Sequence, residues 1–307
     1  MPGDYIFNPE WEWPIMLALF LAGLASGAYA AMGLIHFAGD RGDQAVAHRL
    51  AFIPLPLMAI VPLFLIFDLG QPSRFLNLIL RSSGAPERGP GPIMFNPNSP
   101  MNWGSFAIII FSGFALVAFV DALHHSGRLR VPWLERIAHN VPFLIVGEFL
   151  AIVVSGYSGV LLNVTNQGVW SDTFLVGALF IVFSELSGLA LAAIVSDRMG
   201  ATRTSAAIRT ALFGAAAVSA VVLVIFLVSL AADGAALRAL VASLLVGPVF
   251  WIGVVGAALL VPLVLLAPRG AGHLPSGRLA MVGVVVLLGV LAFRYAMFYS
   301  AIAFVQS

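Results

Sequence analysis

The sequence predicts an all-α integral membrane protein with eight transmembrane helices. Of its 307 residues, 61% are hydrophobic and only 9% are charged, and the mean hydropathy is +1.01. A soluble domain carries about 25% charged residues, so this composition excludes an ordinary soluble protein. Eight separate stretches have the length of about 20 mostly apolar residues that a membrane helix needs. We expect them to form a single domain, residues 1–307, built from two four-helix bundles.

The eight expected spans follow one another with short connections. The first is too long for the apolar core of a signal peptide and lacks a positively charged leader, so we expect it to be retained. The longest connection, residues 70–102, is rich in Pro, Gly, Asn and Ser, which favours an ordered surface loop. The spans are placed near Pro14–Phe37, Ala51–Leu69, Trp103–Leu123, Val141–Asn163, Thr173–Val195, Ile208–Ala232, Leu240–Ala267 and Leu279–Phe304.

The arginines of the connections predict the orientation. Ten lie on one face and four on the face that holds both termini and the long loop. The arginine-rich face is the cytoplasmic one, so both termini are expected on the outer, periplasmic side of a bacterial inner (cytoplasmic) membrane. The ten are Arg41, Arg49, Arg128, Arg130, Arg136, Arg198, Arg203, Arg209, Arg269 and Arg278; the four are Arg74, Arg81, Arg88 and Arg238. The lipid bilayer is then a partner of the protein, and a net charge of +1 gives no reason to expect nucleic acid.

The residue types that are missing narrow the chemistry. The sequence has no cysteine, which excludes disulfides, thiolate metal sites and iron–sulfur clusters held by this chain. It has no lysine either, which rules out a retinal Schiff base. Any electron-transfer role therefore needs a bound organic cofactor and a partner subunit that carries metal clusters.

The histidines argue against a haem deep in the bundle, which would need axial ligands within the membrane. Only His36 lies in an expected span, at its cytoplasmic end. A metal site from His124 and His125 is disfavoured, because adjacent residues on a helix point apart. We expect solvated loop positions for the remaining histidines, which are His48, His124, His125, His139 and His273.

Five ionisable residues in or at the ends of the apolar spans are candidates for function, because such groups are costly in a bilayer. They are Asp68, Asp121, Glu148, Glu185 and Arg294. One interpretation is a proton path from Asp121 to Glu148 and from Glu185 to Arg294. The other is a structural cluster in which Arg294 neutralises one glutamate, with Asp121 as an interfacial end-cap. Gly23 and Gly27, a GxxxG pair in the first span, are read as a packing seam.

Tyr157 is a candidate ligand for a quinone. Gly156 precedes it, and Ser158 and Gly159 follow it, so we expect room beside its ring for a flat group. Asp68 lies at a similar depth. Quinone reduction couples electrons to protons, and a phenol with a nearby carboxylate offers a hydrogen bond and a proton. Trp11 and Trp13 lie just before the first span, where an interfacial belt and a functional role are equally good interpretations. Tyr295 and Tyr299 are four residues apart and share one face of the last span.

Several motifs, taken in order, resemble the NrfD/PsrC-like membrane subunits of polysulfide reductase and related respiratory molybdoenzymes. The resemblance covers essentially the whole sequence. The motifs are Trp11-Glu-Trp, Phe20-Leu-Ala-Gly-Leu-Ala-Ser-Gly, Phe67-Asp-Leu-Gly-Gln-Pro-Ser-Arg-Phe, Asn98-Ser-Pro-Met-Asn-Trp-Gly-Ser, Gly156-Tyr-Ser-Gly-Val-Leu-Leu, Val169-Trp and Phe293-Arg-Tyr. The resemblance implies a haem-free subunit that binds menaquinone or ubiquinone. It also implies docking to a ferredoxin-like iron–sulfur subunit and, usually, a molybdopterin catalytic subunit.

The resemblance also implies roles for individual residues. Tyr157 matches the tyrosine that hydrogen-bonds the quinone, and Asp68 and Arg74 match a turn near the quinone site. A contact with the iron–sulfur subunit is implied for Ser99, Pro100, Asn102 and Trp103. Polysulfide-reductase-type members place an Asn and a His where this sequence has Ile15 and Ala18. Glu12, Asp68 or another group must then supply the second quinone contact.

Three functions remain open from the sequence. The favoured one is a quinone-reactive subunit that exchanges electrons with an iron–sulfur partner. A structural anchor without a working quinone site is the alternative, and it would tolerate Tyr157→Phe. A secondary transporter is disfavoured, because its usual internal repeats and broken mid-membrane helices are not evident here.

Overall fold

The computed structural model describes residues 13–40, 42–80, 93, 95–165, 169–232, 247–267 and 277–305. Apart from one isolated bridge between Leu80 and Ile93, the regular structure of this part of the protein is helical. The helices are α1 (Trp13–Ala38), α2 (Gln44–Leu50), α3 (Pro54–Phe67), the 3-10 helix η1 (Pro72–Leu78), α4 (Pro100–His125), α5 (Pro132–Ala138), α6 (Val141–Asn163), α7 (Leu175–Arg198), α8 (Thr202–Ala232), the π-helix η3 (Val249–Leu260), α10 (Val261–Leu265) and α11 (Arg278–Val305).

Within these described ranges, seven helical segments are long and apolar enough to cross a membrane. They are α1, the continuous segment Gln44–Phe67 that contains α2 and α3, α4, α6, α7, α8 and α11. The prediction of an all-α membrane protein is therefore confirmed. The expected span Leu240–Ala267 begins outside the described residues, and its described part is a shorter apolar helix, Val249–Leu265. The eighth crossing stays a prediction.

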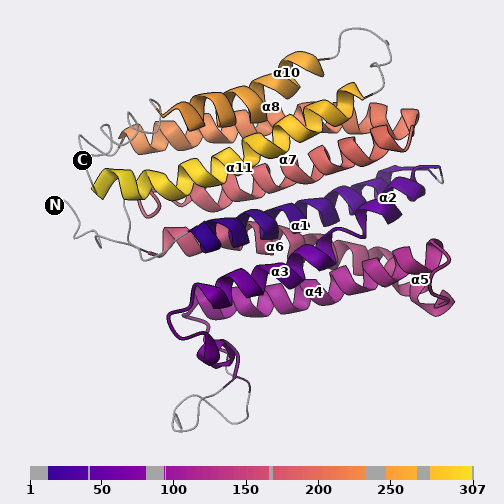
Figure 1. The fold of residues 1–307 in the computed structure, drawn as a ribbon, viewed down its shortest axis with the longest axis horizontal. Coiled ribbons are helices and arrows are strands. Elements are labelled where there is room, and N and C mark those ends of the chain that lie inside the picture. Colours follow the sequence, from indigo (N-terminus) through magenta and orange to yellow (C-terminus); the bar gives the residue numbers. More distant parts are fainter. Residues whose placement is uncertain are drawn as a thin grey trace.

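The long helices lie side by side, with short elements at both ends (Figure 1). The η1 end contains η1, the start of α1 and the end of α11. The opposite end, called the α2–α5 end below, contains α2 and α5. Helix α1 packs against α3, α6 and α7, and α7 packs in turn against α6, α8 and α11. Helices α1 and α7 therefore form the centre of the molecule.

The contact between α1 and α7 depends on glycine. A Cβ at Gly27 would overlap the backbone of Ser184 and touch Gly188, and a Cβ at Gly188 would overlap the backbone of Gly27. The GxxxG pattern thus marks a packing seam at Gly27, as the sequence indicates. Gly23 differs, because a Cβ there would meet the side chains of Arg294 and Ser184.

A buried hydrogen bond fastens the turn between α1 and α2 to α8. The Thr204 hydroxyl donates to Oδ1 of Asp43, and the backbone N–H of Asp40 donates to Oδ2 of the same carboxylate at 2.9 Å. These hydrogen bonds, that of Thr204 first, lower the pKa of Asp43 below its ordinary value of 3.8. Asp43 therefore holds α8 against the α2–α5 end as a carboxylate.

We expect Thr204→Val to lower the thermal unfolding midpoint, because a hydrogen bond to a charged group contributes about 1.5–3 kcal/mol. Since the folded pKa is depressed, this contribution is complete above pH 3.8 and is lost as the pH falls through the lower folded value. The difference in unfolding midpoint between the wild type and Thr204→Val should therefore become smaller only at acidic pH. Thr210→Val, at an exposed position of α8, is the control and should leave the midpoint unchanged. Equal unfolding midpoints of the wild type and Thr204→Val at pH 7 would contradict this role of Thr204.

Candidate functional site

Tyr157 lies on α6 towards the η1 end, with its ring packed against α4. It is half-buried, and a Cβ at Gly104 would overlap its Cζ, Cε1 and hydroxyl oxygen. Glycine at position 104 therefore lets the ring lie flat against the backbone of α4. Within the described residues, the phenol hydroxyl makes no hydrogen bond, so it is available to a ligand.

The glycines beside Tyr157 do not provide the expected space. A Cβ at Gly159 would overlap the backbone of Val176 and Gly177, and a Cβ at Gly156 would press on Ile181. Both glycines face α7, whereas the ring of Tyr157 faces α4. Residues one and two positions away from Tyr157 on the helix point in other directions than its side chain. The expectation of room next to the ring at Gly156 and Gly159 is therefore wrong. The glycine that accommodates Tyr157 is Gly104, on another helix.

The loop before α4 is fastened by the residues that were expected to contact a partner. Ser99 Oγ caps α4 by accepting from the backbone N–H of Asn102 at 3.4 Å, and Pro100 occupies the first turn. The buried amide of Asn102 donates to the carbonyl of Leu78 in η1 and accepts from the N–H of Asn96 at 2.8 Å. These three residues shape the loop from inside.

Trp103 is the member of this group that presents a large apolar surface. Its side chain is 51% exposed, and its Nε1 donates to the carbonyl of Pro97 at 2.9 Å. The exposed ring of Phe95 packs edge-on against it, with centroids 4.9 Å apart. The η1 end thus carries a fixed aromatic pair that faces outward.

The other residues predicted for the quinone site differ in placement. Asp68 follows the last turn of α3 and is half-buried, whereas Arg74 is exposed in η1. Glu12 lies outside the described residues.

Glu148 and Glu185 lie inside the helical core, from neighbouring helices α6 and α7. A Cβ at Gly33 of α1 would overlap Oε1 of Glu148. Glu148 interacts electrostatically with Glu185 and with the phenol of Tyr29, whose oxygen lies against Gly147. One buried oxygen of each of these three side chains has no hydrogen-bond partner among the described residues. Buried polar atoms are usually paired, so this group fits water or a transferable proton.

Arg294 does not neutralise a glutamate. It is 2% exposed, and its Nη2 donates to Ser184 Oγ at 2.8 Å and to the Phe180 carbonyl at 3.4 Å. Its guanidinium lies 3.8 Å from the centroid of the Phe180 ring. Among the described residues no carboxylate lies within ion-pair distance of it. The ion pair expected in the structural-cluster interpretation is therefore wrong, because Arg294 is held by α7 backbone, a hydroxyl and an aromatic face.

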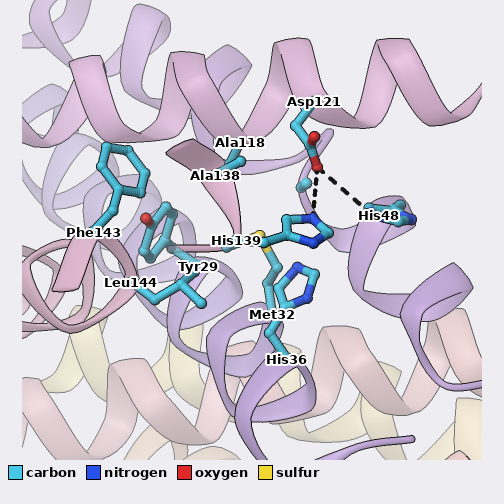
Figure 2. Close-up of a pocket in the computed structure, with 11 residues that line it drawn as sticks. Tyr29, Met32, His36, His48, Ala118, Asp121, Ala138, His139, Phe143 and Leu144 are labelled. Atoms are coloured by element: carbon cyan, nitrogen blue, oxygen red, sulfur yellow. Dashed lines mark hydrogen bonds and ion pairs between the residues drawn. The ribbon is translucent and has the colours of Figure 1, made fainter. Parts of the chain in front are cut away.

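At the α2–α5 end, histidines gather around Asp121, which is only 3% exposed. Its Oδ2 lies 3.1 Å from Nε2 of His139, 3.6 Å from Nε2 of His48 and 3.6 Å from Nδ1 of His125. The ring of His36 lies 4.9 Å from that of His139. Figure 2 shows Asp121, His48, His139 and His36 turned toward one another. We call these five residues, His125 included, the histidine cluster.

The cluster corrects two expectations. Loop positions were expected for His48, His124 and His125, but α4 continues through His125, and His48 lies in α2. His139 does lie in the turn after α5, as expected, and His273 lies outside the described residues. Asp121 is buried and contacts three histidines, so it is not the interfacial end-cap that was expected. The sequence offered one signal, because Asp121 and His125 are four residues apart and share a helix face. The other three histidines come from α1, α2 and the turn after α5, which only the folded protein brings together.

His139, outside the spanning helices, forms the strongest contact with Asp121. The hydrogen bond to that carboxylate raises the pKa of His139 above its usual 6.5. A small cavity, with about the room of a single water molecule, extends from the cluster to Tyr29 (Figure 2). Because Tyr29 lies beside Glu148, polar groups follow one another from the α2–α5 end into the core.

A family described as "Polysulphide reductase, NrfD" matches residues 8–306 of this sequence. The protein belongs to the NrfD family. The C subunit of polysulfide reductase from Wolinella succinogenes is 27% identical over 316 residues, which cover 96% of this sequence and 95% of the relative. Protein NrfD of Escherichia coli K12 is 28% identical over 315 residues, covering 94% of each sequence. The family resemblance predicted from the motifs is therefore confirmed, and this NrfD-family member is a multi-pass membrane protein.

We expect Gly104→Ala to destabilise this NrfD-family protein, because overpacking a fitted site costs about 1–3 kcal/mol. The loss should nearly vanish in the Gly104→Ala, Tyr157→Ala double variant compared with Tyr157→Ala alone, since the methyl group then has no ring to displace. Gly113→Ala is the matched control, because a Cβ at Gly113 of the same helix meets nothing within 4 Å. Unfolding midpoints in one detergent measure these effects. Equal losses for Gly104→Ala in both backgrounds would show that the two residues do not interact.

Proposed function

We propose that this protein is the quinone-binding membrane subunit of a respiratory oxidoreductase complex. In this proposal it passes electrons between a menaquinone or ubiquinone pool and a docked ferredoxin-like iron–sulfur subunit, with a molybdopterin or other catalytic subunit beyond. The family match over residues 8–306 is the observation that carries the proposal. The absence of cysteine supports it too, because a partner must then supply the iron–sulfur clusters.

The quinone site is proposed at the η1 end, around Tyr157. Its hydroxyl has no hydrogen-bond partner among the described residues and can donate to a carbonyl oxygen of the ring. Asp68, at the end of α3, is the proposed proton donor and acceptor, with Arg74 on the nearby surface. Glu12 is the proposed second contact, in place of the absent first-span histidine. Bound quinone would supply two-electron, two-proton redox chemistry, and these side chains would bind and orient it.

The proposed membrane topology keeps the eight spans and the orientation that the sequence predicts. In it, η3 and α10 make the eighth crossing, and the eight spans form two four-helix bundles. The η1 end faces the periplasm, and the arginine-rich α2–α5 end faces the cytoplasm of the bacterial inner membrane. The iron–sulfur partner would then dock on the η1 end. There Trp103 and Phe95 offer exposed aromatic surface, on a loop held by Ser99, Pro100 and Asn102.

We expect Tyr157→Phe to lower quinone-linked turnover of the assembled complex by at least about tenfold, because the variant removes the hydrogen bond that orients the ring. Turnover with an artificial electron acceptor at the catalytic subunit, and co-purification of the partners, should not change. Tyr295→Phe is the control, at a 44% exposed tyrosine of α11. Unchanged quinone-linked turnover in Tyr157→Phe would instead support the structural-anchor alternative.

A proton path from the α2–α5 end is proposed as part of the same function. Asp121, Glu148, Glu185 and Arg294 were its candidates, and Tyr29 adds a hydroxyl between Asp121 and Glu148. Arg294 would contribute a fixed positive charge near Ser184 at the inner end of the path. Neutral buried carboxyls can relay protons.

We expect Glu148→Gln and Glu185→Gln to abolish the membrane potential that turnover generates in sealed proteoliposomes, because an amide cannot pass on a proton. A potential-sensitive dye measures it, and quinone-linked turnover in uncoupled vesicles serves as the control for an intact quinone site. Charge movement that equals that of wild type in both variants would reject this path.

A further inference from the structure

The histidine cluster is a second site, separate from the proposed quinone site at the opposite end of the helices. Four helices or turns supply it: His36 from α1, His48 from α2, Asp121 and His125 from α4, and His139 from the turn after α5. The ligand atoms of His36, His48 and His139 lie within 4.8 Å of one another. Those of His48, Asp121 and His125 do so as well, so His48 belongs to both groups.

The cluster contains more acceptors than the protein satisfies. Oδ1 of Asp121 and Nε2 of His48 are buried without a hydrogen-bond partner in the described part of the protein, although that nitrogen lies 3.6 Å from Oδ2. The rings of His48 and His125 are stacked, with centroids 3.9 Å apart. Protons on every ring would place like charges in contact, whereas a single cation can be shared by several neutral rings and one carboxylate. The side chains thus converge on a position that suits a positive ion.

The types of ligand identify the class of cation. Imidazole nitrogens suit Zn²⁺, Cu²⁺ and Ni²⁺, while Mg²⁺ and Ca²⁺ prefer a shell of oxygens. Three imidazoles with a carboxylate match the four ligands of a tetrahedral zinc site. Zn–N bonds of about 2.0 Å place such ligand atoms about 3.3 Å apart. The ligand atoms within each group lie up to 4.8 Å apart, so the side chains must approach one another by up to about 1.5 Å to close around an ion.

We propose that the histidine cluster binds one Zn²⁺ through His48, His139, Asp121 and either His36 or His125. The ion would join α1, α2, α4 and the turn between α5 and α6 at one point. It would also cover the cavity that leads to Tyr29, so bound Zn²⁺ would close the proposed proton path at Asp121. Neither consequence depends on quinone binding, so the site can be tested without turnover.

The test uses the full-length protein, purified without a polyhistidine tag and treated with a chelator that is then removed. Isothermal titration should show one Zn²⁺ per protein molecule, and Co²⁺ at the same site should give the visible absorption of tetrahedral coordination. His48→Ala removes a ligand from both groups and should weaken Zn²⁺ binding by at least about tenfold. His124→Ala is the matched control, because that half-buried neighbouring ring contacts the carbonyl of Leu129 and belongs to neither group, although it touches the ring of His125.

A second measurement keeps the proposal testable if His48→Ala does not fold. Zn²⁺ bound to the native state should raise the unfolding midpoint of the wild-type protein in proportion to the logarithm of its concentration. The double variant His36→Gln, His125→Gln keeps only three of the proposed ligands, so its rise should require Zn²⁺ concentrations at least about tenfold higher. Wild-type protein that neither binds Zn²⁺ stoichiometrically nor gains stability from it would overturn the proposal. Equal loss of binding in His48→Ala and His124→Ala would overturn it as well.

Discussion

The close contact between α1 and α7 is the constraint on which the polar interior depends. Backbone meets backbone at Gly27 and Gly188, where a single methyl group on either residue would overlap the other helix. In a membrane, packing and small residues hold helices together, because lipid is as apolar as the side chains it contacts. This contact brings α1 alongside the polar residues of its neighbours: Gly23 faces Arg294, and Gly33 faces the carboxylate of Glu148. Gly23 and Gly33 are about 15 Å apart along the helix.

The protein keeps several ionisable groups in an environment that penalises them. The Arg294 guanidinium contacts a hydroxyl, a carbonyl and an aromatic face and no carboxylate, and its Nε and Nη1 are buried without a hydrogen-bond partner among the described residues. Glu148 and Glu185 each keep a buried oxygen without a partner among the described residues. Such groups are tolerated where they have a use. Along α1, Arg294 lies at Gly23 and Glu148 at Gly33, which is the order that the proposed proton path uses.

The two ends of the molecule carry different chemistry. The η1 end carries Tyr157, whose phenol has no hydrogen-bond partner among the described residues, the acid Asp68, and an exposed aromatic pair on a loop that Asn102 holds from inside. The α2–α5 end offers imidazoles around a buried carboxylate. A quinone needs hydrogen bonds at two oxygens of a flat ring, and a metal ion needs several ligand atoms converging on one point. This difference between the two ends is the basis for proposing a quinone at one end and a metal ion at the other.

By itself the sequence determined the class of protein, seven of its spans and its family. Hydropathy averaged over about 20 residues is a local property, and motifs such as the one around Asp68 are contiguous in the sequence, so both can be read without a fold. The tertiary structure alone decided which side chains meet. The glycine that makes room for the ring of Tyr157 is Gly104 and not Gly156. Arg294 donates to Ser184 and does not pair with a glutamate. His36, His48, His125 and His139 lie together near Asp121. These contacts join helices distant in sequence, and their geometry follows from helix packing, which no local pattern encodes.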